Sequence, residues 1–328
     1  MKKILTISVA AYNVENYIKE TLDSILESKY KDEIEIIITN DGSKDNSGSI
    51  ISNYKEKYPN IINYIDQENN GAGSTVNNGI RKATGEYFKM VDGDDWVITE
   101  NLDKLIEYLK EGDVDAVVSN FEYYYELDKS FKKGPSYCIN NREIYDFEKV
   151  CMEMDVATST VTYRTKLLQD NNIEVSKRFY SDYQFQVYPV PFIQTISYLD
   201  IETYVYRIGR EGQSVSVKGY QNHIVDHQNV MYQLIDYYEK NKDICEPNKK
   251  SYILKKISTF INVDLSVLLS FKTCKENKNK IINTINNIEK RSKDIYTLCL
   301  NGNISSKLVS SKFRLYTILS LLKRIKNK

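Results

Sequence analysis

The chain has 328 residues, of which 27% are charged and 41% are hydrophobic, so it is long enough for one large domain and an appended part. Its 45 basic residues are balanced by 45 acidic ones, and the overall charge therefore gives no reason to expect nucleic acid as a partner. The five cysteines lack the paired spacing of zinc sites, and we expect them to be reduced, as in the cytosol.

The amino-terminal segment does not have the pattern of a signal peptide or a membrane span. It begins with two lysines, but its apolar run is interrupted by Thr6, Ser8 and Asn13. We therefore expect a cytoplasmic protein without a transmembrane helix.

The first third of the chain alternates between strand and helix patterns. Residues 4–10, 34–40 and 87–91 are short runs rich in β-branched residues, as in buried parallel strands. Residues 14–26 have apolar residues at helical spacing, and Asn13 is placed to cap that helix. Further helices over 49–58 and 74–84, a strand over 62–66 and a helix stop at Gly85 complete the pattern. Repeated strand–helix–strand units predict an α/β fold with a mostly parallel sheet.

Later segments are less regular and then become helical. Residues 114–215 contain strand patterns and short helix patterns, and within them 195–208 predicts strands around a turn. From about residue 219 the strand patterns disappear. We therefore predict a domain over 1–218 and a helical region over 219–328.

The last segment, 307–328, contains seven basic residues and no acidic one, interleaved with apolar residues. Such a basic amphipathic helix can lie in a membrane interface. The alternative is a helix whose apolar side completes the helical region and whose lysines are solvated. The sequence leaves both interpretations open.

Polar residues collect after the four predicted strands, where ligands bind in open α/β sheets. They are Tyr12 and Asn13 after the first strand, Asp41 after the second, the turn Gly71–Gly73 after the third, and Asp92, Asp94 and Asp95 after the fourth. We expect them to converge at one edge of the sheet.

Two common nucleotide-binding patterns are missing. A dinucleotide site would need a third glycine where Val76 stands, and no glycine-rich loop ends in Gly-Lys-Ser/Thr. Asp92 and Asp94 can instead share a divalent cation, since Mg²⁺ and Mn²⁺ join carboxylates to phosphates. An aspartate-rich turn without a ligand is the alternative. His223 and His227 lack a third ligand, and we expect no metal there.

Five ordered stretches resemble glycosyltransferase family 2. They are SVAAYNVENYIKETLDSIL, EIIITNDGSKDNSGSII, ENNGAGSTVNNGIRKATGEYFKMVDGDDWV, YSDYQFQVYPVP and YRIGREGQSVS, and together they cover about residues 4–216. The resemblance implies a GT-A fold and transfer of a sugar with inversion at the anomeric carbon. It also implies Mn²⁺ or Mg²⁺ as the cofactor.

The resemblance implies roles for residues along the first three strands. Ala11, Tyr12 and Asn13 correspond to the segment that holds the nucleotide base, although the family's proline is absent. Asp41 corresponds to the aspartate that accepts a hydrogen bond from the base, which suits uracil. Gly73 and Asn77 lie in the segment that approaches the nucleotide, where this chain lacks the family's usual arginine.

The resemblance also implies a metal site and a catalytic base. Asp92, Gly93 and Asp94 match the Asp-Xaa-Asp motif, with Asp92 at the ribose or a metal-bound water and Asp94 on the metal.

Asp182 corresponds to the base that accepts the acceptor's proton, although Ser181 replaces the usual acidic neighbour, and Asp95 is the alternative base. Arg207 and Arg210 are cations expected to contact phosphate, and residues 209–216 correspond to a loop that closes over the donor.

The sequence thus predicts a metal-dependent inverting glycosyltransferase of cell-surface polysaccharide synthesis. We expect a nucleotide-sugar donor, with UDP as the carrier, and a glycan or lipid-linked acceptor. The inner face of the cell membrane is the expected location if residues 307–328 bind lipid. An inactive nucleotide-sugar or partner-binding module is the alternative, and a nucleotidyltransferase is disfavoured because no glycine-rich loop grips a triphosphate.

Overall fold

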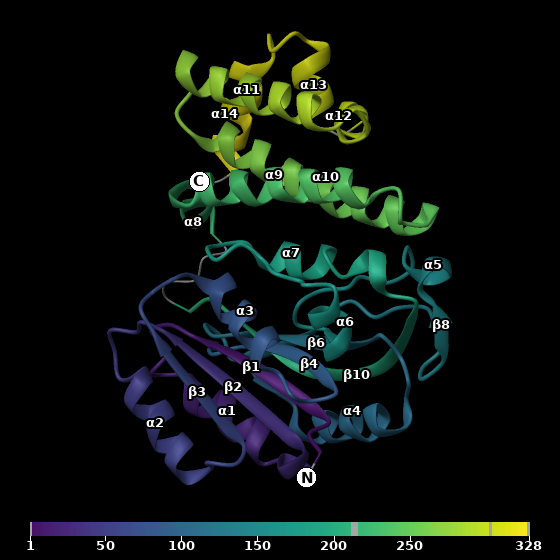
Figure 1. Ribbon diagram of the computed structural model, residues 1–328. Helices are drawn as coiled ribbons and strands as arrows, with labels where there is room; N and C mark the ends of the chain where they lie inside the picture. The colour runs from purple at the N-terminus through teal and green to yellow at the C-terminus, as the bar shows by residue number, and fades with distance from the viewer. Residues whose placement is uncertain (1, 211–215, 302–303, 327–328) are drawn as a thin grey trace. The chain divides into compact units, whose positions relative to one another are not determined.

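A computed structural model describes residues 2–210, 216–301 and 304–326. The chain divides into two compact units, Met1–Arg210 and Glu211–Lys328 (Figure 1). The first unit contains a mixed sheet with helices on both faces, and the second is helical. The boundary that the sequence predicts between a catalytic domain over 1–218 and a helical region over 219–328 stays a prediction.

The first half of the sheet is parallel, as the sequence predicts. Strands β3, β2, β1 and β4 lie in that order and pair in parallel. Their bounds are β1 Leu5–Ala11, β2 Ile34–Asp41, β3 Ile62–Gln67 and β4 Tyr87–Asp92. The four strands therefore end at the same edge, with Asp41 and Asp92 as the last residues of β2 and β4.

Helices cover both faces of this half-sheet. The connecting helices are α1 (Ile18–Leu26), α2 (Ser47–Lys57), α3 (Ala72–Lys82) and α4 (Thr99–Glu111), with a short 3-10 turn at Lys31–Glu33. A Cβ on Gly79 of α3 would lie 2.1 Å from the hydroxyl of Ser8 in β1, so only glycine lets α3 approach the strand this closely. Ser8 and Leu5 lie on opposite faces of β1, because side chains alternate along a strand.

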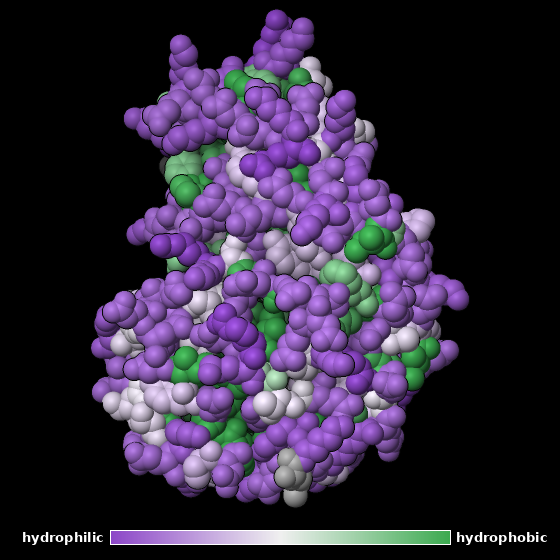
Figure 2. All heavy atoms as spheres, viewed as in Figure 1, coloured by the Kyte–Doolittle hydropathy of each residue, from purple (hydrophilic) through white to green (hydrophobic). Residues whose placement is uncertain are grey.

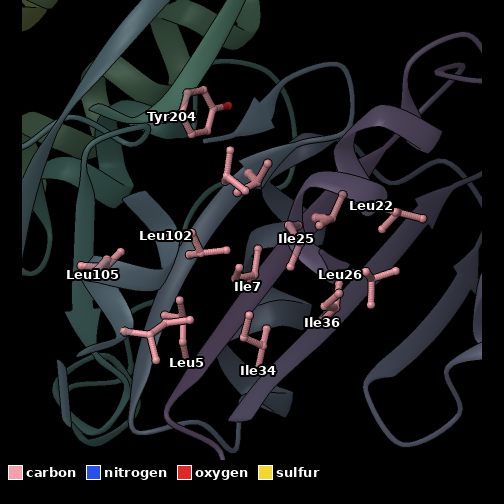
Figure 3. Close-up of a cluster of buried hydrophobic side chains, with 14 of the residues drawn as sticks. Leu5, Ile7, Leu22, Ile25, Leu26, Ile34, Ile36, Leu102, Leu105 and Tyr204 are labelled. Atoms are coloured by element: carbon pink, nitrogen blue, oxygen red, sulfur yellow. The ribbon is translucent and has the colours of Figure 1, made fainter. Parts of the chain in front are cut away.

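The main apolar core lies between β1, β2 and β4 and the helices α1 and α4. Figure 3 shows Leu5 and Ile7 of β1, Leu22 and Ile25 of α1, and Leu102 of α4 converging on one another. All five side chains are fully buried. This core fixes α1 against the sheet, and it thereby fixes the position of the loop that follows β1.

The second half of the sheet is mixed. Strand β9 (Val161–Arg164) lies antiparallel between β4 and β6 (Ala116–Tyr125), and β6 pairs in parallel with β10 (Thr195–Ile208). The other strands are β5 (Trp96–Val97), β7 (Ser130–Lys133) and β8 (Ile144–Asp146). Short helical segments in this half are α5 Phe147–Val150, α6 Thr165–Asp170, α7 Asp182–Val187 and a 3-10 turn at Val190–Phe192.

Two local sequence predictions are wrong. The predicted turn within residues 195–208 is absent, because β10 is continuous and absorbs the irregularity as register shifts between Leu199 and Tyr204. Asn13 does not cap a helix: α1 begins at Ile18, and Asn13 has a left-handed backbone with φ of 51°. Asparagine tolerates this conformation better than most residues.

The second unit consists of helices over the residues that the structure describes. They are α8 Val217–Asn222, α9 Ile224–Asn241, α10 Pro247–Ser270, α11 Lys275–Arg291, α12 Lys293–Leu300, α13 Ser305–Ser310 and α14 Tyr316–Lys326. The single helix expected over 307–328 is instead two, α13 and α14. Among the described helices, none combines the length and the apolar composition that a membrane span requires.

Hydrophilic residues cover most of the face of the molecule seen in Figure 2. One strongly polar group lies deep inside the first unit instead. The amine of Lys89 in β4 is fully buried and donates a hydrogen bond of 2.8 Å to the backbone oxygen of Ser159. Burial lowers the pKa of Lys89 from 10.5 to about 7.

We predict that Lys89 makes stability rise with pH between about 7 and 10.5, the folded and unfolded pKa values. The unfolded chain binds more protons than the folded chain in this window, so the free energy of unfolding increases with pH. Denaturant unfolding of wild type and Lys89→Met at several pH values tests this. The advantage of the methionine variant should be largest below pH 7 and shrink above it, whereas parallel curves would contradict the prediction.

Candidate active site

The loop after β1 presents one exposed aromatic ring. Tyr12 is 48% exposed, whereas Ala11 is 1% exposed and its side chain is part of the apolar core. Ala11 therefore offers only its backbone to a ligand. The Asn13 side-chain oxygen accepts a hydrogen bond of 2.8 Å from the backbone N–H of Lys44. The backbone N–H of Asn13 donates a hydrogen bond to the Ser43 hydroxyl. Asn13 thus joins the loops after β1 and β2, and this leaves Tyr12 at their surface.

Asp41, the last residue of β2, is buried and largely committed to the neighbouring turn. Its carboxylate accepts hydrogen bonds from the backbones of Asn70 and Gly71, both at 2.8 Å, and from the side chain of Gln67 at 2.7 Å. Carboxylate oxygens have about four acceptor positions, so one remains. Asp41 therefore shapes the turn before α3 and keeps capacity for one further donor.

Gly73 lies where α3 meets the segment 175–181. A Cβ on Gly73 would lie 1.6 Å from the backbone oxygen of Ser176 and 2.8 Å from the Ser181 hydroxyl. Asn77, one turn later, forms two hydrogen bonds with the backbone of Val175, at 2.8 and 2.9 Å. In this structure both residues therefore hold the segment that leads to Asp182, rather than facing open space.

Asp182 is the first residue of α7 and is exposed to solvent. The preceding Ser181 is buried and makes no side-chain cap to the helix. The structure brings Asp182 close enough to Asp92 for the two carboxylates to interact electrostatically, although they are ninety residues apart. The two sequence motifs thus meet in one place.

The turn after β4 is held against β1 and α1. The N–H of Gly93 donates a hydrogen bond of 2.9 Å to the backbone of Ala10, and a Cβ on Gly93 would lie 2.7 Å from the same oxygen. The buried hydroxyl of Thr21 in α1 lies 3.1 Å from the backbone oxygen of Gly93 and 2.6 Å from that of Asp95. A glycine between the aspartates is therefore required by the approach of β1.

Asp95 differs from the other two aspartates because it is buried and each of its carboxylate oxygens accepts a hydrogen bond from the protein. It is 1% exposed, and its carboxylate accepts hydrogen bonds from the Tyr204 hydroxyl and from the backbone of Arg207. Burial, followed by the nearby Asp94 and Asp92, raises the pKa of Asp95 well above its usual value. These contacts favour a structural role for Asp95 and weaken the alternative that it is the catalytic base.

Asp92 is exposed, yet its surroundings disfavour its charge. The side chain reaches solvent, but neighbouring protein groups crowd the carboxylate and reduce its hydration. This desolvation, together with repulsion from Asp94 and Asp182, raises the pKa of Asp92 to about 7, and Arg210 opposes the shift. Negative charge at this place therefore exceeds the positive charge that the chain supplies. A bound cation would relieve the repulsion.

Arg207 is enclosed by protein groups. Its guanidinium donates to the backbone oxygen of Asp94 and to the carboxylates of Glu126 and Glu20. The rings that surround it within 4.7–5.3 Å of the guanidinium carbon are Tyr17, Trp96 and Tyr124. The side chain is only 5% exposed. These contacts make Arg207 a support for the aspartate turn and leave it poorly placed for the phosphate contact expected from the sequence.

Arg210 forms an ion pair with a side-chain oxygen of Asp94. It lies at the end of the described part of the first unit, and residues 211–215 of the predicted closing loop lie outside the described residues. The side chains of Arg210 and Asp94 are 19% and 13% exposed. The positive charge that pairs with Asp94 in this structure thus comes from an arginine of the chain itself.

The residues fit a metal that is shared with a ligand rather than a closed metal site. Among the described residues, no group of three or more histidine, cysteine or carboxylate side chains is arranged to hold a metal ion. Asp92 and Asp94 are nevertheless crowded carboxylates at one edge, and Mg²⁺ or Mn²⁺ usually needs only one or two carboxylates when phosphates supply further oxygens. The donor set is therefore compatible with a divalent cation bound together with a diphosphate.

Sequence reasoning missed the residues that support this turn. Tyr17 is the N-cap of α1, Glu20 and Thr21 lie on that helix, Tyr204 lies on β10, and Glu126 directly follows β6. The helical spacing of α1 predicts which side is buried, but it gives no sign that Glu20 would meet an arginine 187 residues later. The alternation of Tyr204 and Tyr206 along β10 indicates that the two side chains share a face, but not that Tyr204 would meet Asp95.

The comparisons with known proteins all point to the same protein family. The family model described as Glycosyl transferase family 2 matches residues 6–171. The chain is 32% identical over 218 residues to glycosyltransferase GlyA of Streptococcus pneumoniae, covering 62% of this chain and 30% of that protein. It is 28% identical over 272 residues to the putative glycosyltransferase EpsH of Bacillus subtilis, covering 81% of this chain and 76% of that protein.

The first two curated relatives are longer than the matched region, since the chain spans 30% of GlyA and 49% of glycosyltransferase GlyG. Among solved structures, S. aureus TarS 1-349 in complex with UDP-GlcNAc has a TM-score of 0.65 at 22% identity, covering 99% of this chain and 89% of that one. The mannosyltransferase PcManGT from Pyrobaculum calidifontis, in complex with GDP-Man and Mn²⁺, has a TM-score of 0.51 at 16% identity, covering 100% of this chain and 88% of that one. The GT-A fold expected from the sequence is confirmed.

We predict that Gly73→Ala displaces the segment before Asp182. The new Cβ would meet backbone atoms of Ser176, which cannot rotate away as a side chain can. We expect a loss of about 1–3 kcal/mol in the free energy of unfolding, measured with denaturant, and lower enzymatic activity.

Gly48→Ala in α2 is the matched control, because its Cβ would meet only side-chain atoms of Asn40 and Tyr64, no closer than 3.1 Å. It should change stability by less than Gly73→Ala does, because side chains can shift to relieve the contact and alanine favours the helix by about 0.5–1 kcal/mol relative to glycine. Equal stability and activity of the two variants would show that Gly73 is not needed for close approach.

Proposed function

Because the chain belongs to glycosyl transferase family 2, we propose that it is an inverting, metal-dependent glycosyltransferase that takes a sugar from a nucleotide-sugar donor. The observation that carries this proposal is the meeting of Asp92, Asp94 and Asp182 from distant parts of the chain. Arg210 compensates this cluster only in part, which makes the cluster costly for folding and understandable as a site for a cation and a reacting hydroxyl. The acceptor in this proposal is a hydroxyl of a glycan or a lipid-linked sugar.

The nucleotide in this proposal binds at the ends of β1 and β2. The exposed ring of Tyr12 offers a surface on which a base can stack, and Asp41 keeps one acceptor position for a base N–H. A uracil N3–H matches this acceptor, so we infer a UDP-linked donor. Crystals of TarS with UDP and with UDP-GlcNAc, a protein of similar fold, agree with this choice.

Asp92 and Asp94 are the residues that would hold Mn²⁺ or Mg²⁺ together with the donor diphosphate. A divalent cation there would stabilise the negative charge that develops on the leaving diphosphate. Arg210 is paired with Asp94 in this structure, and it would be able to contact a phosphate oxygen if a divalent cation bound that carboxylate. Arg207 has no such freedom, because Glu20 and Glu126 already hold it.

Asp182 is the proposed catalytic base. Inversion requires that the acceptor oxygen forms its bond to the anomeric carbon on the side opposite the departing diphosphate. A carboxylate on that side takes the proton of the attacking hydroxyl as the bond forms. Asp182 is exposed and lies at the start of α7, and the contacts of Gly73 and Asn77 with residues 175–181 keep it in place.

The helix α14 is the proposed contact with a lipid surface. Its exposed apolar side chains, Ile318, Leu321, Leu322 and Ile325, are spaced as one helical stripe, while Tyr316 and Ser320 are buried. Basic residues of the same segment, such as Lys312 and Arg324, favour anionic lipid. We infer a place on the cytoplasmic side of a membrane, where lipid-linked acceptors for cell-surface polysaccharides would be within reach.

We predict that Asp94→Asn and Asp182→Asn separate donor binding from proton transfer. Asp94→Asn should weaken the thermal stabilisation that UDP gives in the presence of Mn²⁺. Asp182→Asn should leave that stabilisation intact and reduce sugar transfer by at least about 10²-fold, the usual contribution of a general base. Asp170→Asn, at a surface carboxylate of α6, is the control and should behave as wild type.

The assay follows the release of UDP from a panel of UDP-sugars, with and without Mn²⁺. Full transfer activity in the Asp94 and Asp182 variants would refute the assignment of the site. Binding of UDP without any turnover in the wild type would instead favour the alternative of an inactive nucleotide-sugar-binding module.

We predict that replacing Leu322 and Ile325 with serine weakens binding to vesicles that contain an anionic phospholipid. The two side chains are 56% and 69% exposed, so their loss removes membrane-facing apolar area without opening the core. Co-sedimentation with vesicles measures the effect, and Leu127→Ser, at a 97% exposed leucine of the first unit, is the control. Equal sedimentation of both variants would contradict the membrane contact.

A further inference from the structure

A row of tyrosine rings lies on one face of strands β6 and β10. The strand register places Tyr206 opposite Tyr123 and Ile208 opposite Tyr125, so the three tyrosines share a face. The ring centres of Tyr123 and Tyr206 are 6.2 Å apart, and those of Tyr123 and Tyr125 are 6.4 Å apart. All three side chains are half-buried, which leaves part of each ring exposed.

The row begins at the carboxylate cluster. Tyr204, two residues before Tyr206 on β10, donates a hydrogen bond to Asp95 and lies on the same face of the strand. Besides burial, the carboxylates that raise the pKa of Tyr206 are Asp92, Asp95, Asp94 and Asp182. The Tyr206 hydroxyl is therefore within electrostatic reach of every proposed catalytic carboxylate.

The order of strands places this row on the side away from the proposed nucleotide site. The strand order in the sheet is β3-β2-β1-β4-β9-β6-β10. Tyr12 and Asp41 lie at the ends of β1 and β2, on one side of β4 and its Asp92. The strands β6 and β10 lie on the other side of β4. An acceptor that attacks opposite the departing diphosphate must reach the carboxylates from the side that the nucleotide does not occupy. The tyrosine row lies on that side.

The chemistry of the row suits a sugar ring. Aromatic faces pack against the C–H groups of a pyranose, while phenol hydroxyls donate to and accept from its hydroxyls. An acyl chain would gain from the rings but would leave the phenol groups without partners. We propose that Tyr123, Tyr125 and Tyr206 bind the sugar ring of the acceptor and guide its hydroxyl towards Asp182, an inference that rests on the proposed function.

Leucine substitutions test this proposal because they remove the aromatic face and keep apolar volume. Tyr123→Leu and Tyr125→Leu should raise the KM for the acceptor by about three- to tenfold, while UDP release from the donor by hydrolysis stays unchanged. Tyr206→Phe keeps the ring and should affect the acceptor KM less than Tyr206→Leu. Phe131→Leu, on the opposite face of the same hairpin, is the matched control and should leave the acceptor KM unchanged.

The acceptor probes are methyl glycosides of glucose, galactose, mannose and N-acetylglucosamine, added with a donor that the enzyme hydrolyses. Binding of the same glycosides is measured separately by saturation-transfer NMR with UDP and Mn²⁺ present, at concentrations up to about 10 mM, where even weak sites are filled. Loss of the NMR signal in Tyr123→Leu, but not in Phe131→Leu, supports the proposal.

Three results would overturn it: no glycoside binds to the wild type, Phe131→Leu loses binding equally, or the tyrosine variants lose donor hydrolysis to the same extent as acceptor use. These outcomes differ from failure of the proposed function, which would be the absence of donor hydrolysis in the wild type. Thermal midpoints of all variants show whether any loss comes from unfolding.

Discussion

Three aspartates at the end of one strand, facing a fourth from a distant helix, are the constraint on which the rest of the site depends. Like charges in a partly desolvated place repel one another, and the raised pKa values of Asp92 and Asp95 express that cost. The protein offsets this electrostatic cost by different contacts at different aspartates. Asp95 is buried with the Tyr204 hydroxyl and a backbone N–H, whereas Asp94 is paired with Arg210, a cation at the surface of the turn.

The supporting groups are themselves held from several directions. Arg207 binds the backbone of the aspartate turn, and two carboxylates and three aromatic rings enclose it. A buried guanidinium that donates hydrogen bonds in three directions and is packed between rings has little freedom to change its conformation. The turn can therefore keep Asp92 exposed and Asp94 paired with Arg210 at the edge of the sheet without losing its own conformation.

A second support runs through α3. Gly73 and Asn77 are used to bring residues 175–181 against this helix, and Asp41 arranges the turn before it. In the proposed function, the nucleotide-binding turn and the segment of the catalytic base are thus parts of one packed arrangement. Such a connection would let donor binding at β2 stabilise the position of Asp182, because both ends share the start of α3.

Local patterns were sufficient for the elements and for the convergence of polar residues. Strands β1 to β4 and the helices between them follow from period and composition, and their parallel order places Asp41 and Asp92 at one edge. The tail was predicted less well: the break between α13 and α14 follows from no local signal that we used. The continuity of β10 was missed for a similar reason, since pairing with β6 overrides a turn-like composition.

The sequence by itself determined the order of strands and helices, the family resemblance and the set of polar residues at the strand ends, because these depend on spacing along the chain. Tertiary structure alone decided which of the predicted site residues have side chains accessible to a ligand. It enclosed Arg207, turned Asn77 towards Val175, buried Asp95 and left Tyr12 exposed, since each outcome depends on partners more than twenty residues away. Long-range packing has no local sequence period, and this is why the availability of a side chain could not be predicted from the motif that contains it.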